Sequence, residues 1–198
     1  SGTVGPTIIQ SGGAIAPGDS IGTLSVTGDI RFERGATYEV EVSPGGTSSD
    51  LIHASGKARL FGGSVVHVGE DGLYRPNQRY TIITADQGVE GRFDGVNSRY
   101  LFLDPRLDYD ANTVSLTLLR NDLSFAAIAQ TRNQAQTALG LQSLGDTHPL
   151  WLSFTQLRDV TEARRAYDSL SGESHATAKA VVIEGSQAVR GAVSDRLL

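Results

Sequence analysis

The chain has 198 residues, a formal net charge of −5, 23 glycines, and neither cysteine nor methionine. The absence of cysteine excludes a disulfide framework and thiolate chemistry. The acidic balance, without any cluster of Lys and Arg, argues against nucleic acid as a partner, and no run of about 20 apolar residues could span a membrane as a helix.

A Gly-Asp-Ser sequence at residues 18–20 raises the possibility of a nucleophilic serine. Ser20 would need a histidine base and an oxyanion hole, and Thr23–Val26 continues as a strand where a nucleophile elbow requires a helix. No histidine has the Asp-x-x-His spacing of esterases that use Gly-Asp-Ser; the four are His53, His67, His148 and His175. We therefore predict a turn here, begun by Pro17-Gly18.

Short strand-like runs follow along the first part of the chain, at residues 22–26, 36–42, 64–68, 79–84, 101–103 and 113–119. Several alternate with a period of two, which predicts strands that bury one face only. In the second run the inward face is Tyr38, Val40 and Val42. In the last run Val114, Leu116 and Leu118 point one way, and Ser115 and Thr117 point the other.

The segment from Thr27 can be laid over the segment from Ser55. The matched positions are Arg31 with Arg59, Phe32 with Leu60, Gly35 with Gly63, Tyr38 with Val66, and Val40 with Val68. A repeat of this length is typical of stacked coils, and we predict a mostly β N-terminal part folded as a right-handed parallel β-helix. A β-sandwich of hairpins also gives evenly spaced short strands and stays open as the alternative.

Aromatic residues crowd the last strands of this part: Tyr74, Tyr80, Phe93, Tyr100, Phe102 and Tyr109. An exposed sheet end must be covered, so these residues could close the stack, or they could be ordinary core and turn aromatics. The predicted folding and capping residues are Tyr80, Phe93, Tyr100, Phe102, Leu116 and Leu118.

The sequence predicts no catalytic, cofactor-binding or metal site. His53 and His67 lie in strand-like runs without a carboxylate at metal-ligand spacing. The loop from Asp104 to Thr113 carries several aspartates but lacks the central Gly and terminal Glu of an EF-hand. The glycine-rich stretch near His67 has no helix after it that could hold a phosphate.

After Asn121 the apolar period becomes helical, which predicts domains at residues 1–120 and 121–198. Ser124 and Gly145 mark the start and stop of a first helix, and a second helical pattern runs from Leu150 to Ala163. A last helix over 173–198 carries a stripe of small residues suited to a confined space, although a surface helix could also dock such a face. The stripe includes Ala178, Val181, Gly185, Ala188 and Ala192.

Three segments carry a resemblance to a known family. "GGAIAPGDSIGTLSVTGDIRFERGATYEVEV", residues 12–42, resembles the passenger-associated repeat of bacterial type V autotransporters. "YTIITADQGVEGRFDGV", residues 80–96, looks like the text just before the translocator of this family. "YDSLSGESHATAKAVVIEGSQAVRGAVSDRLL", residues 167–198, is similar to the segment that leads into its β-barrel.

The resemblance implies an exported protein of a Gram-negative bacterium, displayed at the cell surface from an outer-membrane barrel. The β-helical stem would end in an autochaperone, the helix over 173–198 would thread the chain's own C-terminal β-barrel, and the chain would be a fragment of a longer one. We predict a stem and junction that is not an enzyme and binds no cofactor, with a surface ligand unknown. The alternatives are an adhesin surface, or a serine hydrolase whose active domain lies upstream. The helical pattern over 123–170 departs from a plain β-helix.

Overall fold

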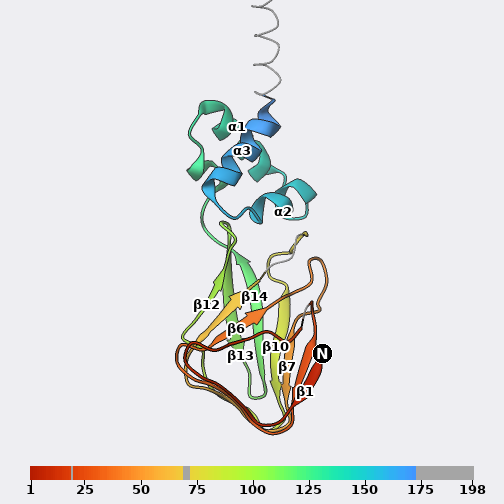
Figure 1. Cartoon of the computed structure of the whole chain (residues 1–198). Helices are drawn as coiled ribbons and strands as arrows, with labels where there is room; N and C mark the ends of the chain where they lie inside the picture. Colours follow the sequence, from red (N-terminus) through yellow and green to blue (C-terminus); the bar gives the residue numbers. More distant parts are fainter. Residues whose placement is uncertain (19, 69–71, 173–198) are drawn as a thin grey trace, which may run out of the picture. The chain divides into compact units, whose positions relative to one another are not determined.

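The computed structural model describes residues 1–18, 20–68 and 72–172 (Figure 1). The chain divides into two compact units: residues 1–123 together with 146–158, and residues 124–145 together with 159–198. The first is called the β-rich unit and the second the helical unit. The domain boundary that the sequence predicts between residues 120 and 121 stays a prediction.

Strands β1 to β12 of the β-rich unit follow one another in groups of three, each called a triplet. The first and second triplets are β1 (Gly2–Val4), β2 (Thr7–Ile9), β3 (Ala14–Ile15), and β4 (Thr23–Val26), β5 (Ile30–Phe32), β6 (Thr37–Val40). The third and fourth are β7 (Leu51–Ala54), β8 (Ala58–Leu60), β9 (Ser64–His67), and β10 (Arg79–Ala85), β11 (Val89–Gly91), β12 (Gly95–Ser98).

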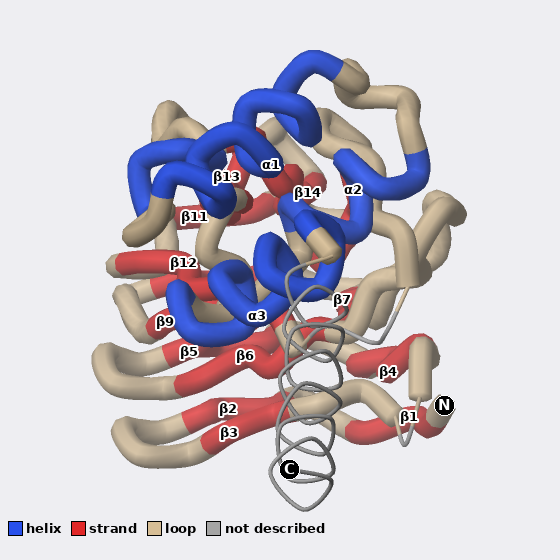
Figure 2. Tube along the Cα trace, turned by 90° about the horizontal axis from the view of Figure 1, so that it is seen from above, coloured by secondary structure: helices blue, strands red, loops and turns tan. Residues whose placement is uncertain are grey.

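Equivalent strands of successive triplets pair in parallel and build three sheets (Figure 2). Their orders are β1-β4-β7-β10, β2-β5-β8-β11 and β3-β6-β9-β12. The antiparallel pair β13 (Leu103–Tyr109) and β14 (Thr113–Arg120) extends the first sheet beyond β10. The mostly β character is confirmed, and the sandwich of hairpins is wrong because hairpins require antiparallel neighbours.

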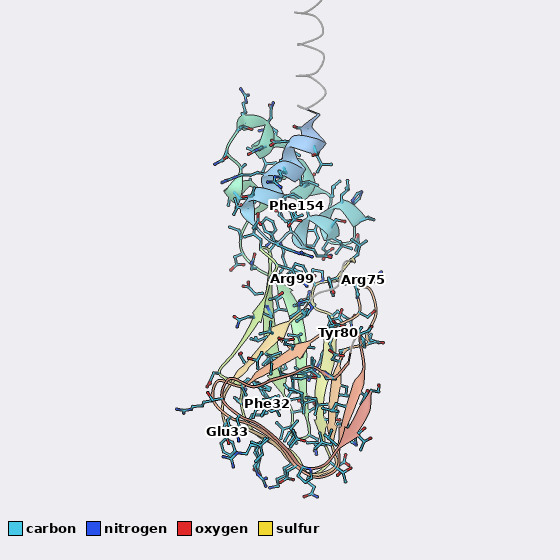
Figure 3. The ribbon with its side chains drawn as sticks, viewed as in Figure 1. Phe32, Glu33, Arg75, Tyr80, Arg99 and Phe154 are labelled. Carbon is cyan, nitrogen blue, oxygen red and sulfur yellow. The ribbon has the colours of Figure 1, made fainter. Side chains whose placement is uncertain are left out.

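The core lies between the three sheets and follows the alternation of the strands. Phe32, Tyr38 and Val40 are fully buried, whereas Arg31, just before Phe32, and Glu39, between Tyr38 and Val40, are exposed. Figure 3 labels Phe32 and Tyr80 on their strands in this unit. Such side chains gain roughly 1.5–3 kcal/mol each from burial, which only a neighbouring triplet can provide.

The one-sided burial predicted for β14 is wrong. Ser115 and Thr117 are 1% and 8% exposed, so both are buried, like Leu116 between them. Thr117 lies opposite Arg79 of β10 on one side and Arg106 of β13 on the other. A small side chain flanked by long ones is covered by its neighbours, so the polar face of this strand does not reach solvent.

The predicted repeat register holds in one sheet and slips by one residue in the next. Arg31 pairs with Arg59 as expected, but Val40 pairs with His67 and not with Val68. The turn between β5 and β6 spans residues 33–36, while the turn between β8 and β9 spans only 61–63. Because side chains alternate along a strand, this slip moves His67 to the buried face.

Asp50, just before β7, bonds residues at both ends of the second triplet. Its carboxylate accepts one hydrogen bond from the Gly22 N–H at 2.8 Å and another from the Glu41 N–H at 2.9 Å. The side chain is buried, with 2% of the residue exposed. These bonds satisfy backbone donors that lie outside the strand ladders.

Tyr38→Phe is expected to lower the free energy of unfolding of the β-rich unit by about 1–2 kcal/mol. The Tyr38 hydroxyl donates to the Ile82 carbonyl at 2.8 Å, at the point where β10 bulges against β14. Its loss leaves that buried carbonyl unsatisfied. Urea denaturation measures the change, and Tyr109→Phe, on a half-buried ring, is the milder comparison. An unchanged unfolding midpoint for Tyr38→Phe would contradict the role of this bond.

The helical unit contains the 3-10 helix η1 (Phe125–Ile128), α1 (Arg132–Ser143) and α3 (Val160–Ser171). Thr131 and Asp159 cap α1 and α3 with their side chains, and the Tyr167 hydroxyl donates to the Phe125 carbonyl. The single helix predicted between Ser124 and Gly145 is broken because Thr131 is extended at the cap.

The second helical pattern is split as well. It forms α2 (Pro149–Thr155), which belongs to the β-rich unit, and α3, because Asp159 adopts an extended conformation between them. Across the described residues, every helix is too short or too polar to cross a lipid bilayer. The helix predicted over 173–198, with its stripe of small residues, lies outside the described part of the chain.

Candidate functional site

The first of the three parallel ladders of the β-rich unit is closed at one end by a hairpin. Strand β10 pairs in parallel with β7 through residues 83–85, and antiparallel with β14 through residues 79–84. The outer strand β13 carries Pro105 and the charged residues Asp104, Arg106 and Asp108. Proline and charged side chains disfavour further pairing at a sheet edge, so β13 and β14, the closing hairpin, end the first sheet.

Three of the predicted capping residues meet under the closing hairpin. Tyr80 lies opposite Leu116 in the register of β10 and β14, and Tyr80, Leu116 and Leu118 are at most 1% exposed. The Tyr80 hydroxyl donates to the Ser43 carbonyl at 3.2 Å. Burial raises the pKa of the Tyr80 hydroxyl above its ordinary value of 10.0. Tyrosine suits this position because its ring fills apolar space while its hydroxyl satisfies a loop carbonyl.

A triangle of aromatic rings includes a histidine that sequence reasoning missed. The rings of His67, Tyr74 and Tyr100 lie with centroids 5.5–5.7 Å apart. His67 Nδ1 lies 3.1 Å from the Ser98 Oγ, and its Nε2 has no hydrogen-bond partner among the described residues. Burial, and secondarily the charge of Arg99, lowers the pKa of His67 from 6.5 to about 4. The imidazole is therefore neutral at ordinary pH.

Phe93 is placed on a different part of the same core. Its ring packs edge-on against Phe32, with centroids 5.1 Å apart, and its N–H donates to the Tyr109 hydroxyl at 3.2 Å. The guanidinium of Arg92 lies 4.5 Å from the centroid of the Tyr109 ring. Phe93 thus links the second sheet to the end of β13.

Phe102 is held against α2, an element that the sequence placed with the helical part. Its ring lies 5.5 Å from that of Phe154, and the guanidinium of Arg120 lies 5.2 Å from its centroid. The Leu101 N–H donates to the Leu157 carbonyl at 2.8 Å. Trp151, Leu152 and Phe154 of α2 are buried, so this helix covers the same end as the closing hairpin.

Ser20 is exposed at a tight turn before β4. A Cβ on Gly18 would lie 2.5 Å from the Ser20 carbonyl oxygen, which shows how tightly the chain bends. The described histidines have other partners: His53 bonds Thr84, His67 bonds Ser98, and His148 caps α2. Asp19 and His175 lie outside the described residues. Within that described part, no cluster of three or more His, Asp or Glu side chains could hold a metal ion.

The chain is similar to secreted proteases of one bacterium. An extracellular serine protease of Serratia marcescens is 31% identical over 246 aligned residues, which cover 99% of this chain and 23% of that protein. A second extracellular serine protease of the same organism is 29% identical, over 91% of this chain and 22% of that protein. The chain therefore spans under a quarter of the length of these relatives. No protein-family model matches it.

These relatives overturn the prediction that the chain is not an enzyme, because both are named as proteases. That prediction rested on the surroundings of Ser20 and on the spacing of the histidines. The segment in which we looked for a catalytic set corresponds to 23% of the length of the first relative. Motifs within this segment give no information about the rest of that relative.

Proposed function

We propose that the chain is the passenger stem and junction of a secreted serine protease of the autotransporter type. Its β-rich unit would be a right-handed parallel β-helix with the triplets as rungs. The stem would support folding of the passenger and its translocation to the cell surface. The partner would be the protein's own C-terminal β-barrel in the outer membrane, threaded by the segment that carries Ala178, Val181, Gly185, Ala188 and Ala192.

The closing hairpin is the single observation that carries this proposal. It ends the first sheet beyond β10, while β1, at the other edge of that sheet, has a partner on one side only within the described residues; β11 and β12 are edge strands of the other two sheets. A first sheet with one finished edge and one open edge can grow in one direction. The printed names of the relatives, extracellular serine protease, agree with export of the chain.

The proposed mechanism is folding in sequence from the closed end. Leu116 and Leu118 lie on β14, which pairs with β13 across the short turn at residues 110–112 and with β10 on its other side. The hairpin of β13 and β14 would form first, because so short a turn needs little loop-closure entropy, and its pairing with β10 would then bury Tyr80, Leu116 and Leu118. Each later triplet would pair with the preceding one and add buried area that opposes backward sliding of the chain.

The test is surface display of the full-length protein carrying Leu116→Asp. A charge buried against Tyr80 removes the folding template, and we expect severalfold less passenger at the cell surface, with the amount of inserted barrel unchanged. Antibody labelling of intact cells measures display, and heat-modifiability of the barrel on gels measures insertion.

Two variants serve as controls for this experiment. Ile8→Asp adds the same charge at a side chain that is 58% exposed, and it should leave display unchanged. Ile30→Asp damages an equally buried position in the second triplet, and it should reduce display less than Leu116→Asp because the closing hairpin still folds. Equal loss of display for Leu116→Asp and Ile30→Asp, or no loss for Leu116→Asp, would exclude the folding order.

A further inference from the structure

A groove lies on the outer surface of the β-rich unit where the second sheet turns into the third. The hollow has a volume of about 660 Å3, and Ile8, Gln10, Arg31, Glu33, Arg34 and Phe61 are among its lining residues. Figure 3 labels Glu33 on this side of the unit, next to the buried Phe32. The lining comes from three successive triplets, so the groove runs along the direction in which the triplets stack.

Two large apolar side chains stand exposed in this groove. Ile8 is 58% exposed and Phe61 is 49% exposed. The guanidinium of Arg31 lies 4.6 Å from the centroid of the Phe61 ring, on one of its faces. Exposed aliphatic and aromatic groups beside arginine are the composition that dominates binding energy at protein interfaces.

The charges of the groove do not cancel. Arg31 pairs with Glu33 through its Nε at 2.5 Å, so its terminal N–H groups are not used in that pair. Arg34 is exposed and forms no ion pair with any residue that the structure describes. Two guanidinium groups against one carboxylate give the groove a cationic character in a chain of net charge −5.

The neighbouring charges on the same sheet are already paired with each other. Arg59 bonds both Asp29 and Glu90, and Lys57 bonds Glu90 at 2.5 Å. The positive charge without an ion pair among the described residues is therefore that of Arg34, which lies beside the Arg31–Glu33 pair. Arginine binds carboxylates with two parallel hydrogen bonds, so an acidic side chain is the natural complement.

We propose that this groove binds an extended peptide segment of another protein, with an acidic residue between apolar ones. Neighbouring strands lie about 4.8 Å apart, so Ile8 and Phe61, two triplets apart, are separated by about 10 Å along the stack. Three residue rises of an extended polyproline II segment, about 3.1 Å each, cover this distance and place side chains i and i+3 on the same side. The apolar residues would contact Ile8 and Phe61, and the carboxylate would bond Arg34 and Arg31. The proposal is independent of the secretion role.

The binding test uses a fluorescein-labelled peptide with Leu-Glu-Glu-Leu between glycines, and anisotropy as the readout. Arg34→Gln and Phe61→Ala should each weaken binding about tenfold, and the Leu-Gln-Gln-Leu peptide should bind more weakly than Leu-Glu-Glu-Leu. The matched control is Arg106→Gln on β13, which removes the same charge from a side chain that is 63% exposed, and it should bind like the original chain. Circular dichroism verifies the fold of each variant.

Two results would overturn the proposal. One is the absence of measurable peptide binding, or equal binding by Arg34→Gln, Phe61→Ala and the original chain. The other is tighter binding of a single-stranded oligonucleotide that is lost in the same variants, since the groove would then recognise phosphate and not a peptide carboxylate. Neither result changes the outcome of the display experiment.

Discussion

Gly63→Ala is expected to lower the free energy of unfolding of the β-rich unit by about 3 kcal/mol or more. Gly63 has a φ of 82°, which a residue with a Cβ rarely adopts. An added Cβ would lie 2.6 Å from the Ala36 carbonyl oxygen and 3.1 Å from that of Glu33. The Ala36 carbonyl cannot move away freely, because it accepts the Ser64 N–H at 2.8 Å.

Urea denaturation followed by the fluorescence of Trp151 measures this effect. Trp151 is the chain's only tryptophan, it is buried, and it belongs to the β-rich unit. Gly95→Ala is the matched control, since a Cβ at Gly95 meets nothing within 4 Å and its φ is not positive; we expect a change of under about 1 kcal/mol. Equal midpoints for the two variants would show that the short turn at residues 61–63 tolerates a side chain.

The β-rich unit is expected to lose about 3 kcal/mol of stability as the pH falls from above 6.5 to about 4. The pKa of His67 is about 4 in the folded chain against 6.5 for an ordinary histidine. Between these values the unfolded chain binds a proton that the folded chain excludes, so acid favours unfolding. The stability is complete above pH 6.5 and this contribution is lost at pH 4.

Unfolding midpoints in urea, measured at neutral pH and near pH 4.5, check this dependence. His67→Gln removes the titrating group and should flatten the acid slope, whereas His53→Gln, on an intermediate-exposure residue bonded to Thr84, should keep it. The pKa values of Asp29 and Glu90 are lowered by hydrogen bonds from Lys57, and these carboxylates titrate in every variant alike. If the unfolding midpoint of His67→Gln falls with pH as much as that of the original chain, another group causes the acid sensitivity.

Local patterns in the sequence were enough to predict a strand and its buried face where the strand is long and alternates regularly. Tyr38, Val40 and Val42 are buried as predicted, and the runs at 79–84 and 113–119 correspond to β10 and β14. The strand predicted at 101–103 begins only at Leu103, because the Leu101 N–H bonds Leu157 and not a neighbouring strand. Strands as short as β3, with two residues, carry no readable period.

The site was predictable in its aromatic members but not in its histidine. The repeat aligned His67 with Glu39, a residue on the outer face, because the alignment kept one offset throughout. The structure pairs Glu39 with Val66 instead, since one residue is missing from the turn before β9. A glycine-rich turn that is shorter by one residue has the same composition, so the sequence does not reveal the shift. The register of β9 is set by its contacts with strands that are distant in sequence. The same limit hid the packing of α2 against Phe102.

The arrangement of the triplets also determines how damage spreads. Each strand of the second and third triplets bonds only the equivalent strands just before and just after it. The unit therefore behaves as a one-dimensional chain of couplings between nearest neighbours. A lesion at one junction, such as the turn at Gly63, interrupts the ladders there, and the parts on either side then rely on core contacts that span the third triplet, such as the bond from the Tyr38 hydroxyl to the Ile82 carbonyl. The force needed to unfold the unit is then set by its weakest junction.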